Sequence, residues 1–295
     1  MFRRRPLDRP VEAARRLTAG RFSLEIAGGA VVGHRYPDNY DALHVDPELP
    51  LAVICDGMGQ GEGSRLAGAT TIQTFVGQVR AAWPAIDAAG LRAATAETQR
   101  RVRRAASTRT GITGCTLTAM VAQPDGEQAW LVHLGDSRAY RLRDGLLELI
   151  TVDHSMAWLG LLHGWWPADS PEATRARYQL LRYVGHPDQP EPDLLAVPLR
   201  RGDTWLLCTD GVSDQIGYHR LRDLLAVRRD PARAVQSLLD ASLDEGGEDN
   251  ATAVVLRVHP AGPPDAESPA PAQFRRTGPA GAAARLPWVE SAVGR

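Results

Sequence analysis

Hydrophobic and polar positions follow two different periods between residues 21 and 259. Leu51–Cys55 is a continuous apolar run of strand length, and Arg21–Val32 has the composition of an extended segment. Apolar residues then recur at helical spacing over residues 66–79 and again over 91–105. The pattern predicts strands followed by two long helices in succession.

The next part of the chain predicts β-hairpins. The turn sequence Pro124-Asp125-Gly126 separates the apolar runs Cys115–Ala122 and Ala129–Leu134. In the same way, Asp144-Gly145 separates the runs Ser137–Leu142 and Leu146–Ile150. Short loops with these turn residues join antiparallel strands. We therefore expect the four runs to form one antiparallel meander.

Towards the C-terminus, helical and strand patterns alternate again. Residues 155–182 are mixed and mostly helical, and Thr204–Cys208 is a buried strand. Asp230-Pro231 has the residue types of a helix start, and Ala251–Val258 is a final strand. Strands in hairpins and helices in pairs predict an α+β fold of layers rather than a doubly wound parallel sheet.

The two ends of the chain differ in charge from its middle. Residues 1–20 hold six arginines against Asp8 and Glu12, a net charge of +4, whereas residues 260–295 carry +1 and the whole chain −1. We expect a basic arm over 1–20 with a short helix at Val11–Leu17, a folded domain over 21–259, and a disordered tail rich in Pro, Ala and Gly over 260–295.

Composition excludes several classes of protein. All 34 basic residues are arginine, so chemistry that needs a lysine, as in P-loop enzymes, protein kinases and Schiff-base enzymes, is excluded. The net charge of −1 argues against a nucleic-acid binder, and no run is long enough to span a membrane. The three isolated cysteines, Cys55, Cys115 and Cys208, predict buried thiols in a reducing compartment, so we expect a cytoplasmic protein.

Five aspartates lie at the ends of predicted strands. They are Asp41, Asp56, Asp136, Asp210 and Asp249. Taken singly, an Asp-Gly pair is most often a turn. In an antiparallel sheet, the end of one strand and the start of its neighbour lie at the same edge. We therefore expect the five carboxylates to converge there. Clustered carboxylates repel, and oxygen ligands without His or Cys favour Mg²⁺ or Mn²⁺.

The order of these motifs resembles a known family, the metal-dependent Ser/Thr protein phosphatases of type 2C in their bacterial form. The matching segments are Arg35…Asn39-Tyr40-Asp41, Asp56-Gly57-Met58-Gly59, Gly114-Cys115-Thr116, Gly135-Asp136-Ser137-Arg138-Ala139-Tyr140, Asp153-His154-Ser155, Cys208-Thr209-Asp210-Gly211-Val212-Ser213-Asp214 and Glu248-Asp249-Asn250-Ala251-Thr252. The resemblance covers most of the chain. It implies a catalytic domain over 21–259 built as a four-layer α/β-sandwich, with two antiparallel sheets flanked by helices.

The resemblance also implies a metal site. Asp56 would bridge two Mn²⁺ or Mg²⁺ ions, and the carbonyl of Gly57 would bind one of them. Asp210 and Asp249 would hold the second ion. Asp136 with Asp210 would form a third site. The ions would activate water for attack on a phosphoryl group.

Two further roles follow from the resemblance. Asp41 would bind a metal-coordinated water, and Arg35 would grip the substrate phosphate with its guanidinium fork. Three residues separate Arg35 from Asn39 where the family usually has two, so Arg138 and Arg182 are the alternative phosphate ligands. His34 and His154 are expected to be structural or solvent-facing, and the Trp-rich segment 155–190 corresponds to the flap beside the site.

The sequence therefore predicts a signalling hydrolase that removes phosphate from phosphoserine and phosphothreonine in proteins by attack of a metal-bound water. Two alternatives remain open: a catalytically inactive phosphatase-like binding module, and a hydrolase of small phosphate esters. The expected partners are phosphorylated proteins and a Ser/Thr kinase that acts on the same substrates, with no nucleic acid and no membrane span. We expect a monomer.

Overall fold

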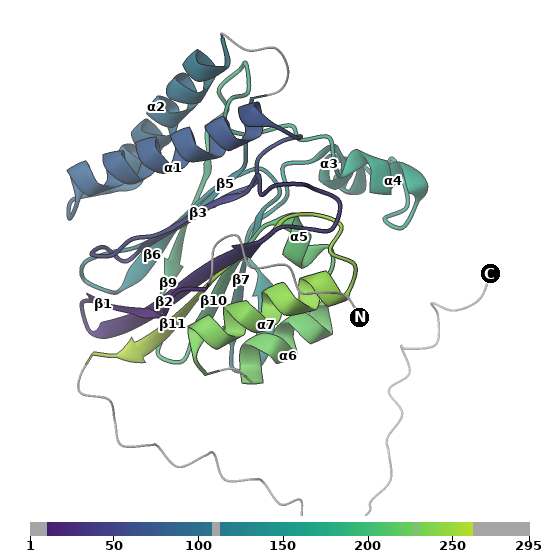
Figure 1. Cartoon of the computed structure of the whole chain (residues 1–295). Coiled ribbons are helices and arrows are strands. Elements are labelled where there is room, and N and C mark those ends of the chain that lie inside the picture. Colours follow the sequence, from purple (N-terminus) through teal and green to yellow (C-terminus); the bar gives the residue numbers. More distant parts are fainter. Residues whose placement is uncertain (1–10, 108–112, 228, 262–295) are drawn as a thin grey trace, which may run out of the picture. The chain divides into compact units, whose positions relative to one another are not determined.

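The protein is described by a computed structural model that covers residues 11–107, 113–227 and 229–261. Two antiparallel sheets lie face to face, with helices on their outer faces (Figure 1). The six-stranded sheet has the order β1(Arg15–Ala19), β2(Phe22–Val31), β11(Ala251–Pro260), β10(Thr204–Cys208), β7(Arg138–Arg143), β8(Leu146–Leu149). The five-stranded sheet has the order β3(Ala42–Val45), β4(Leu51–Cys55), β5(Leu117–Ala122), β6(Gln128–Leu134), β9(Asp193–Pro198).

Three apolar clusters join four layers. The helices α1(Glu62–Ala82) and α2(Ala88–Ala106) pack on the five-stranded sheet through residues such as Phe75 and Leu91. Side chains from both sheets, Trp205 among them, fill the space between the sheets. The helices α6(Tyr218–Val227) and α7(Pro231–Asp244) cover the six-stranded sheet. The predicted four-layer sandwich is confirmed.

Local sequence explains several of these elements. The α7 helix begins where the Asp230 carboxylate accepts hydrogen bonds from the amides of Ala232 and Arg233, as the Asp-Pro pair predicts. The two long helices and the strands β2, β4, β10 and β11 lie where the hydrophobic pattern places them. The segment 155–182 contains only two short helices, α3(Met156–His163) and α4(Pro171–Ala176).

The predicted meander is wrong in one respect. Strands β5 and β6 form a hairpin in the five-stranded sheet, whereas β7 and β8 form a hairpin in the six-stranded sheet. The chain changes sheets at Gly135, whose φ of 112° is disfavoured for other residues. A Cβ there would lie 2.5 Å from Cγ2 of Thr116, so the crossing requires glycine.

The short helix expected at Val11–Leu17 is also wrong, because this segment leads into strand β1. Alternation explains the difference: Leu17 packs against the apolar cluster between the sheets, while Arg16 pairs with Glu25 of β2. Residues 1–10 of the expected arm and residues 262–295 of the expected tail lie outside the described residues.

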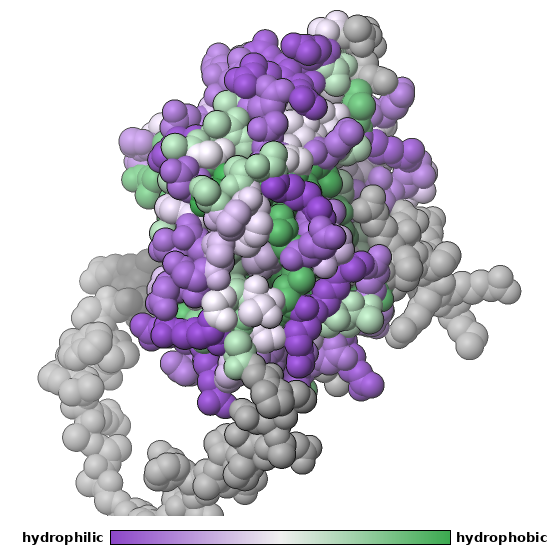
Figure 2. Space-filling model, turned by 90° about the vertical axis from the view of Figure 1, so that its left-hand side faces the viewer, coloured by the Kyte–Doolittle hydropathy of each residue, from purple (hydrophilic) through white to green (hydrophobic). Residues whose placement is uncertain are grey.

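One side of the domain has a largely polar surface. The side away from α3 and α4 carries mostly hydrophilic side chains, with small hydrophobic areas between them (Figure 2). Among the helices that the structure describes, none combines the length and the apolar character needed to cross a bilayer.

Candidate active site

A cavity of about 490 Å³ opens where strand ends of both sheets meet. The predicted site residues that line it are Arg35, Asp56, Gly57, Asp136, Asp210 and Asp249. Four of the five aspartates thus face one cavity, and the expected convergence is confirmed for them.

Each aspartate is placed by a strand. Asp56 follows β4, and its amide donates to Oγ1 of Thr116 at 2.8 Å. That hydroxyl lies 2.7 Å from Oγ of Ser137, which follows Asp136, so the segments of Asp56 and Asp136 are tied together. In the other sheet, Asp210 follows β10 and begins the short helix α5(Asp210–Ser213), and Asp249 precedes β11.

Asp41 lies beside this group but is not among the residues that line the cavity. Its Oδ2 accepts hydrogen bonds from the hydroxyls of Thr209 at 3.0 Å and Thr252 at 2.7 Å. Burial raises its pKa well above the ordinary value, and the charges of Asp249 and Asp210 add to this effect. These influences show that Asp41 belongs to the same electrostatic cluster.

The carboxylates raise one another's pKa values. Burial is the largest cause for Asp56 and for Asp136, and in both cases the charge of Asp210 comes next. The pKa of Asp210 is raised mainly by burial as well. Burial and the charge of Asp210 raise the pKa of Asp249 to about 6. A cluster of this kind is costly to ionise without a neutralising cation.

The donor set fits a hard divalent cation. Oδ1 of Asp210 is buried without a hydrogen-bond partner among the described residues, so it needs a ligand from elsewhere. Carboxylate and carbonyl oxygens are the ligands that Mg²⁺ and Mn²⁺ prefer. Within the described ranges, no group of three or more His, Cys, Asp or Glu side chains already stands in the geometry of a bound ion. The fit therefore rests on the chemistry of the donors.

Glycine at position 57 lets the backbone approach this site. A Cβ on Gly57 would lie 2.4 Å from the carbonyl oxygen of Tyr40 and 2.9 Å from Cβ of Ser64. The residue pairs with Cys115 in an isolated bridge, which continues the β4–β5 ladder to the cavity. Only glycine leaves room for the loop of Tyr40 at this point.

Of the three candidate phosphate ligands, only Arg35 lines the cavity. Its side chain is 68% exposed and contacts Glu248 loosely, at 3.4 Å. Arg138 instead donates three hydrogen bonds to Asp153, two from Nε at 2.9 and 3.2 Å and one from Nη2 at 2.6 Å. Arg182 pairs with Asp193 at 2.8 Å. The longer spacing before Asn39 thus leaves Arg35 at the cavity, and the two alternative arginines serve other contacts.

His154 has the structural role expected of it. Its Nδ1 accepts a hydrogen bond from the amide of Gly135 at 3.1 Å, and its Nε2 lies 3.0 Å from Asp193. Burial lowers its pKa. His34 is exposed, and its Nε2 lies 3.4 Å from the carbonyl of Leu243.

Sequence reasoning gave no role to Asn250, which holds the loop that carries the N-terminal site residues. Its side-chain oxygen accepts from the amide of Tyr40 at 2.9 Å, and its amide donates to the carbonyl of Asp38 at 3.2 Å. Asp214 was also missed, although it lines the cavity. Both lie inside the quoted motifs, which was the available signal.

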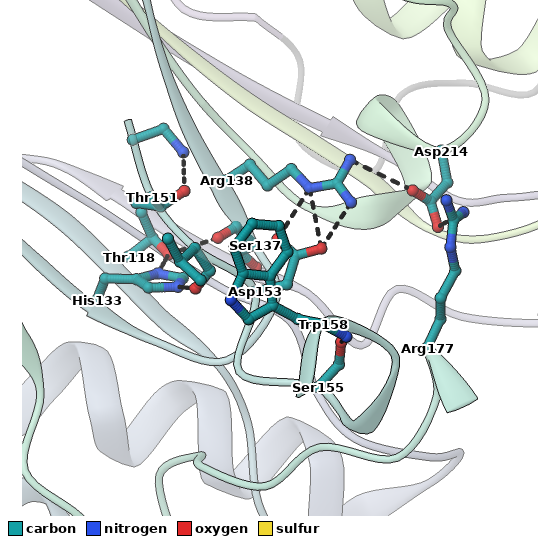
Figure 3. A network of polar contacts seen from close by, with 12 residues as sticks. Thr118, His133, Ser137, Arg138, Thr151, Asp153, Ser155, Trp158, Arg177 and Asp214 are labelled. Carbon is teal, nitrogen blue, oxygen red and sulfur yellow. Dashed lines mark hydrogen bonds and ion pairs between the residues drawn. The ribbon is translucent and has the colours of Figure 1, made fainter. Parts of the chain in front are cut away.

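The flap lies beside the cavity, as expected. Tyr178 and Leu180 of this segment line it, and Figure 1 shows α3 and α4 projecting at the same end as α5. Asp214 of the cavity wall lies 3.6 Å from Arg177 of the flap and 3.5 Å from Arg138 of β7, as Figure 3 shows.

Comparisons with known proteins show the family to which the chain belongs. Residues 32–246 match the family model of protein phosphatase 2C. The serine/threonine phosphatase stp of Listeria welshimeri is 26% identical over 233 residues, which are 76% of this chain and 91% of that protein.

Two solved structures extend the agreement to the fold. PppA, described as a key regulatory component of T6SS in Pseudomonas aeruginosa, is 32% identical with a TM-score of 0.72 over 83% of this chain and 100% of its own. The catalytic domain of the serine/threonine phosphatase PstP, in complex with two manganese ions, is 29% identical with a TM-score of 0.71 over 81% of this chain and 99% of its own. The chain therefore belongs to the protein phosphatase 2C family, as a metal-dependent serine/threonine protein phosphatase of the bacterial type.

Proposed function

We propose that the cavity hydrolyses phosphoserine and phosphothreonine in proteins with two divalent cations, Mn²⁺ or Mg²⁺. Asp56 would contact both ions, the Gly57 carbonyl one of them, and Asp210 with Asp249 the second. Asp136 with Asp210 would hold a third. Such cations, when bound, activate water and neutralise charge on phosphate oxygens.

The observation that carries this proposal is a cluster of five carboxylates, four of which face one cavity and all of which have raised pKa values. A binding module without catalysis has no use for so costly a cluster. The complete acidic set therefore counts against the inactive alternative, and no observation favours the small-ester alternative.

The residues around the cluster have separate tasks. Arg35 would bind two oxygens of the substrate phosphate, because it is exposed at the cavity and only loosely paired. Asp41 would orient a water molecule. Two threonine hydroxyls fix one of its oxygens and leave the other free of that constraint. Asn250 would hold Arg35 and Asp41 in position, because its side chain forms hydrogen bonds to the loop between them.

The test is release of phosphate from a phosphothreonine peptide by the purified full chain, with and without Mn²⁺. Asp210→Asn is expected to abolish the activity and to weaken Mn²⁺ binding in calorimetry. Asp188→Asn is the matched control, because that carboxylate is 89% exposed. Activity without a divalent ion, or unchanged activity in Asp210→Asn, would contradict the proposal.

The biological setting follows from this chemistry. A Ser/Thr kinase must supply the phosphoprotein substrates, and we propose that the chain opposes such a kinase as a monomer. The cytoplasmic location stays a prediction, with which three free and buried cysteines agree.

A further inference from the structure

The flap and the segment just before it carry an unusual share of exposed apolar side chains. Eight of the ten large hydrophobic residues that are exposed in the described chain lie between Leu146 and Tyr178. The helix α3 is apolar almost throughout, yet Gly160 is its only buried residue among those described. A helix that is apolar on all sides is normally covered. This one therefore presents a surface for a partner.

These side chains surround a groove of about 220 Å³, here called the flap groove. Its lining includes Leu149, Val152, Trp158, Leu161, Trp166 and Arg177. This volume is below that of pockets for drug-sized ligands, which suits one amino-acid side chain better than a small molecule.

The groove is built by local structure. The Ser155 hydroxyl accepts a hydrogen bond from the amide of Trp158 and fixes the first turn of α3. Trp166 packs on the helix at Gly160, where a Cβ would lie 2.5 Å from its ring. Asp153, which also lines the groove, is held by three hydrogen bonds from Arg138 (Figure 3).

The flap groove adjoins the catalytic cavity. Arg138 and Arg177 line the groove, Asp214 lines the cavity, and Asp214 lies 3.5 and 3.6 Å from the two guanidinium groups. Arg177 and its neighbour Tyr178 face the groove and the cavity respectively. The ion pairs of Asp214 with Arg138 and Arg177 thus lie between the flap groove and the catalytic cavity. An extended peptide advances about 3.3 Å per residue, so the four residues on either side of the phosphorylated one span about 13 Å in each direction.

We infer that the flap groove selects substrates: it takes a bulky apolar side chain within four residues of the phosphoserine or phosphothreonine. This inference rests on the proposed function, because it assumes that the phosphate lies in the aspartate cavity. Full burial of such a side chain would improve binding about 10- to 100-fold. The lining residues Trp158 and Leu161 stay 37% and 49% exposed, so the groove covers only part of the side chain and we expect binding to improve about five- to tenfold.

The test compares peptides that differ in one residue. Fluorescent peptides with polar flanks carry a non-hydrolysable phosphonate in place of the phosphate, and one phenylalanine is placed in turn at each position from −4 to +4. Binding to the full chain with Mn²⁺ is measured by polarisation. At least one position is expected to bind about five- to tenfold more tightly than the polar parent.

The variant Leu161→Gln is expected to lose this gain, whereas Leu162→Gln is the matched control. Both leucines are exposed on α3, at 49% and 65%, and only Leu161 lines the groove. Equal binding of all peptides, or equal effects of the two variants, would overturn the inference. So would tighter binding of every peptide by Leu161→Gln, since the groove would then hold a segment of the chain itself. Mn²⁺-dependent hydrolysis of p-nitrophenyl phosphate reports separately on the proposed function.

Discussion

Removing one charge from the aspartate cluster should stabilise the metal-free protein. Burial and the charge of Asp210 raise the pKa of Asp249 to about 6 from its ordinary 3.8. Each pKa unit corresponds to about 1.4 kcal/mol, so ionising Asp249 in the folded chain costs at most about 3 kcal/mol at neutral pH. The side chain is partly exposed, so solvent screens part of this cost and the ionisation costs about 2 kcal/mol.

The variant Asp249→Asn removes this cost and keeps the oxygen that accepts from the amide of Asn250, at 2.7 Å. For a domain of this size, about 2 kcal/mol corresponds to a rise of roughly 4–8 °C in Tm. The assay is thermal unfolding in EDTA at pH 7, with Asp188→Asn as a control that should leave Tm unchanged.

The pH dependence gives a sharper test. The unfolded chain ionises Asp249 at lower pH than the folded chain, so the cost is absent below about pH 4, grows up to about pH 6 and is complete at pH 7. Roughly half of the gain should therefore remain at pH 5. With saturating Mn²⁺ the order should reverse, since the wild type binds the ion better. A variant no more stable than the wild type in EDTA at pH 7, or equally stabilised at pH 5 and pH 7, would refute the reasoning.

Three further predictions concern the surroundings of the cluster. Arg35→Ala should raise KM for a phosphopeptide about tenfold in steady-state kinetics and Arg35→Lys less, because a lysine keeps the charge without the fork; an unchanged KM in both would contradict this. Asn250→Ala should lower the free energy of unfolding in urea by about 2 kcal/mol, because the buried amide of Tyr40 and the partly buried carbonyl of Asp38 lose their partner, whereas no loss would show that water replaces it. Gly211→Ala should weaken Mn²⁺ binding in calorimetry, because its Cβ would lie 2.0 Å from the carbonyl of Asn250, whereas Gly217→Ala, with open space around it, should bind normally.

The hydrophobic pattern was informative wherever an element buries a continuous or periodic face. The run Leu51–Cys55 is fully buried, and the strand therefore lies as predicted. Strand β9 was missed because only one of the six residues of Asp193–Pro198 is buried at the edge of its sheet, which leaves a weak pattern. The sheet change at Gly135 was missed for another reason: loop length specifies that neighbouring strands are antiparallel, but not that all of them share one sheet.

The candidate site was predicted through the ends of strands rather than through the strands themselves. In an antiparallel sheet, the ends and starts of neighbouring strands meet at one edge, which predicts that the aspartates converge. The structure confirms this for four of them, which line one cavity. The contacts that hold their loops span far more of the sequence. The hydrogen bond from Tyr40 to Asn250 joins residues 210 positions apart, and no local pattern encodes such a contact.

The cavity and the flap groove divide the work of recognition. Arg35 and the aspartates face a phosphate group, which every phosphorylated serine or threonine presents in the same form. Contacts of this kind favour reaction without distinguishing one protein from another, since specificity is a difference between affinities. Discrimination must then come from residues that meet the flanking sequence. The apolar helix α3 offers such contacts, and it belongs to the flap, whose Arg177 pairs with Asp214 of the cavity wall. Changes on α3 should therefore alter which substrates are chosen while leaving the chemistry at the aspartates intact.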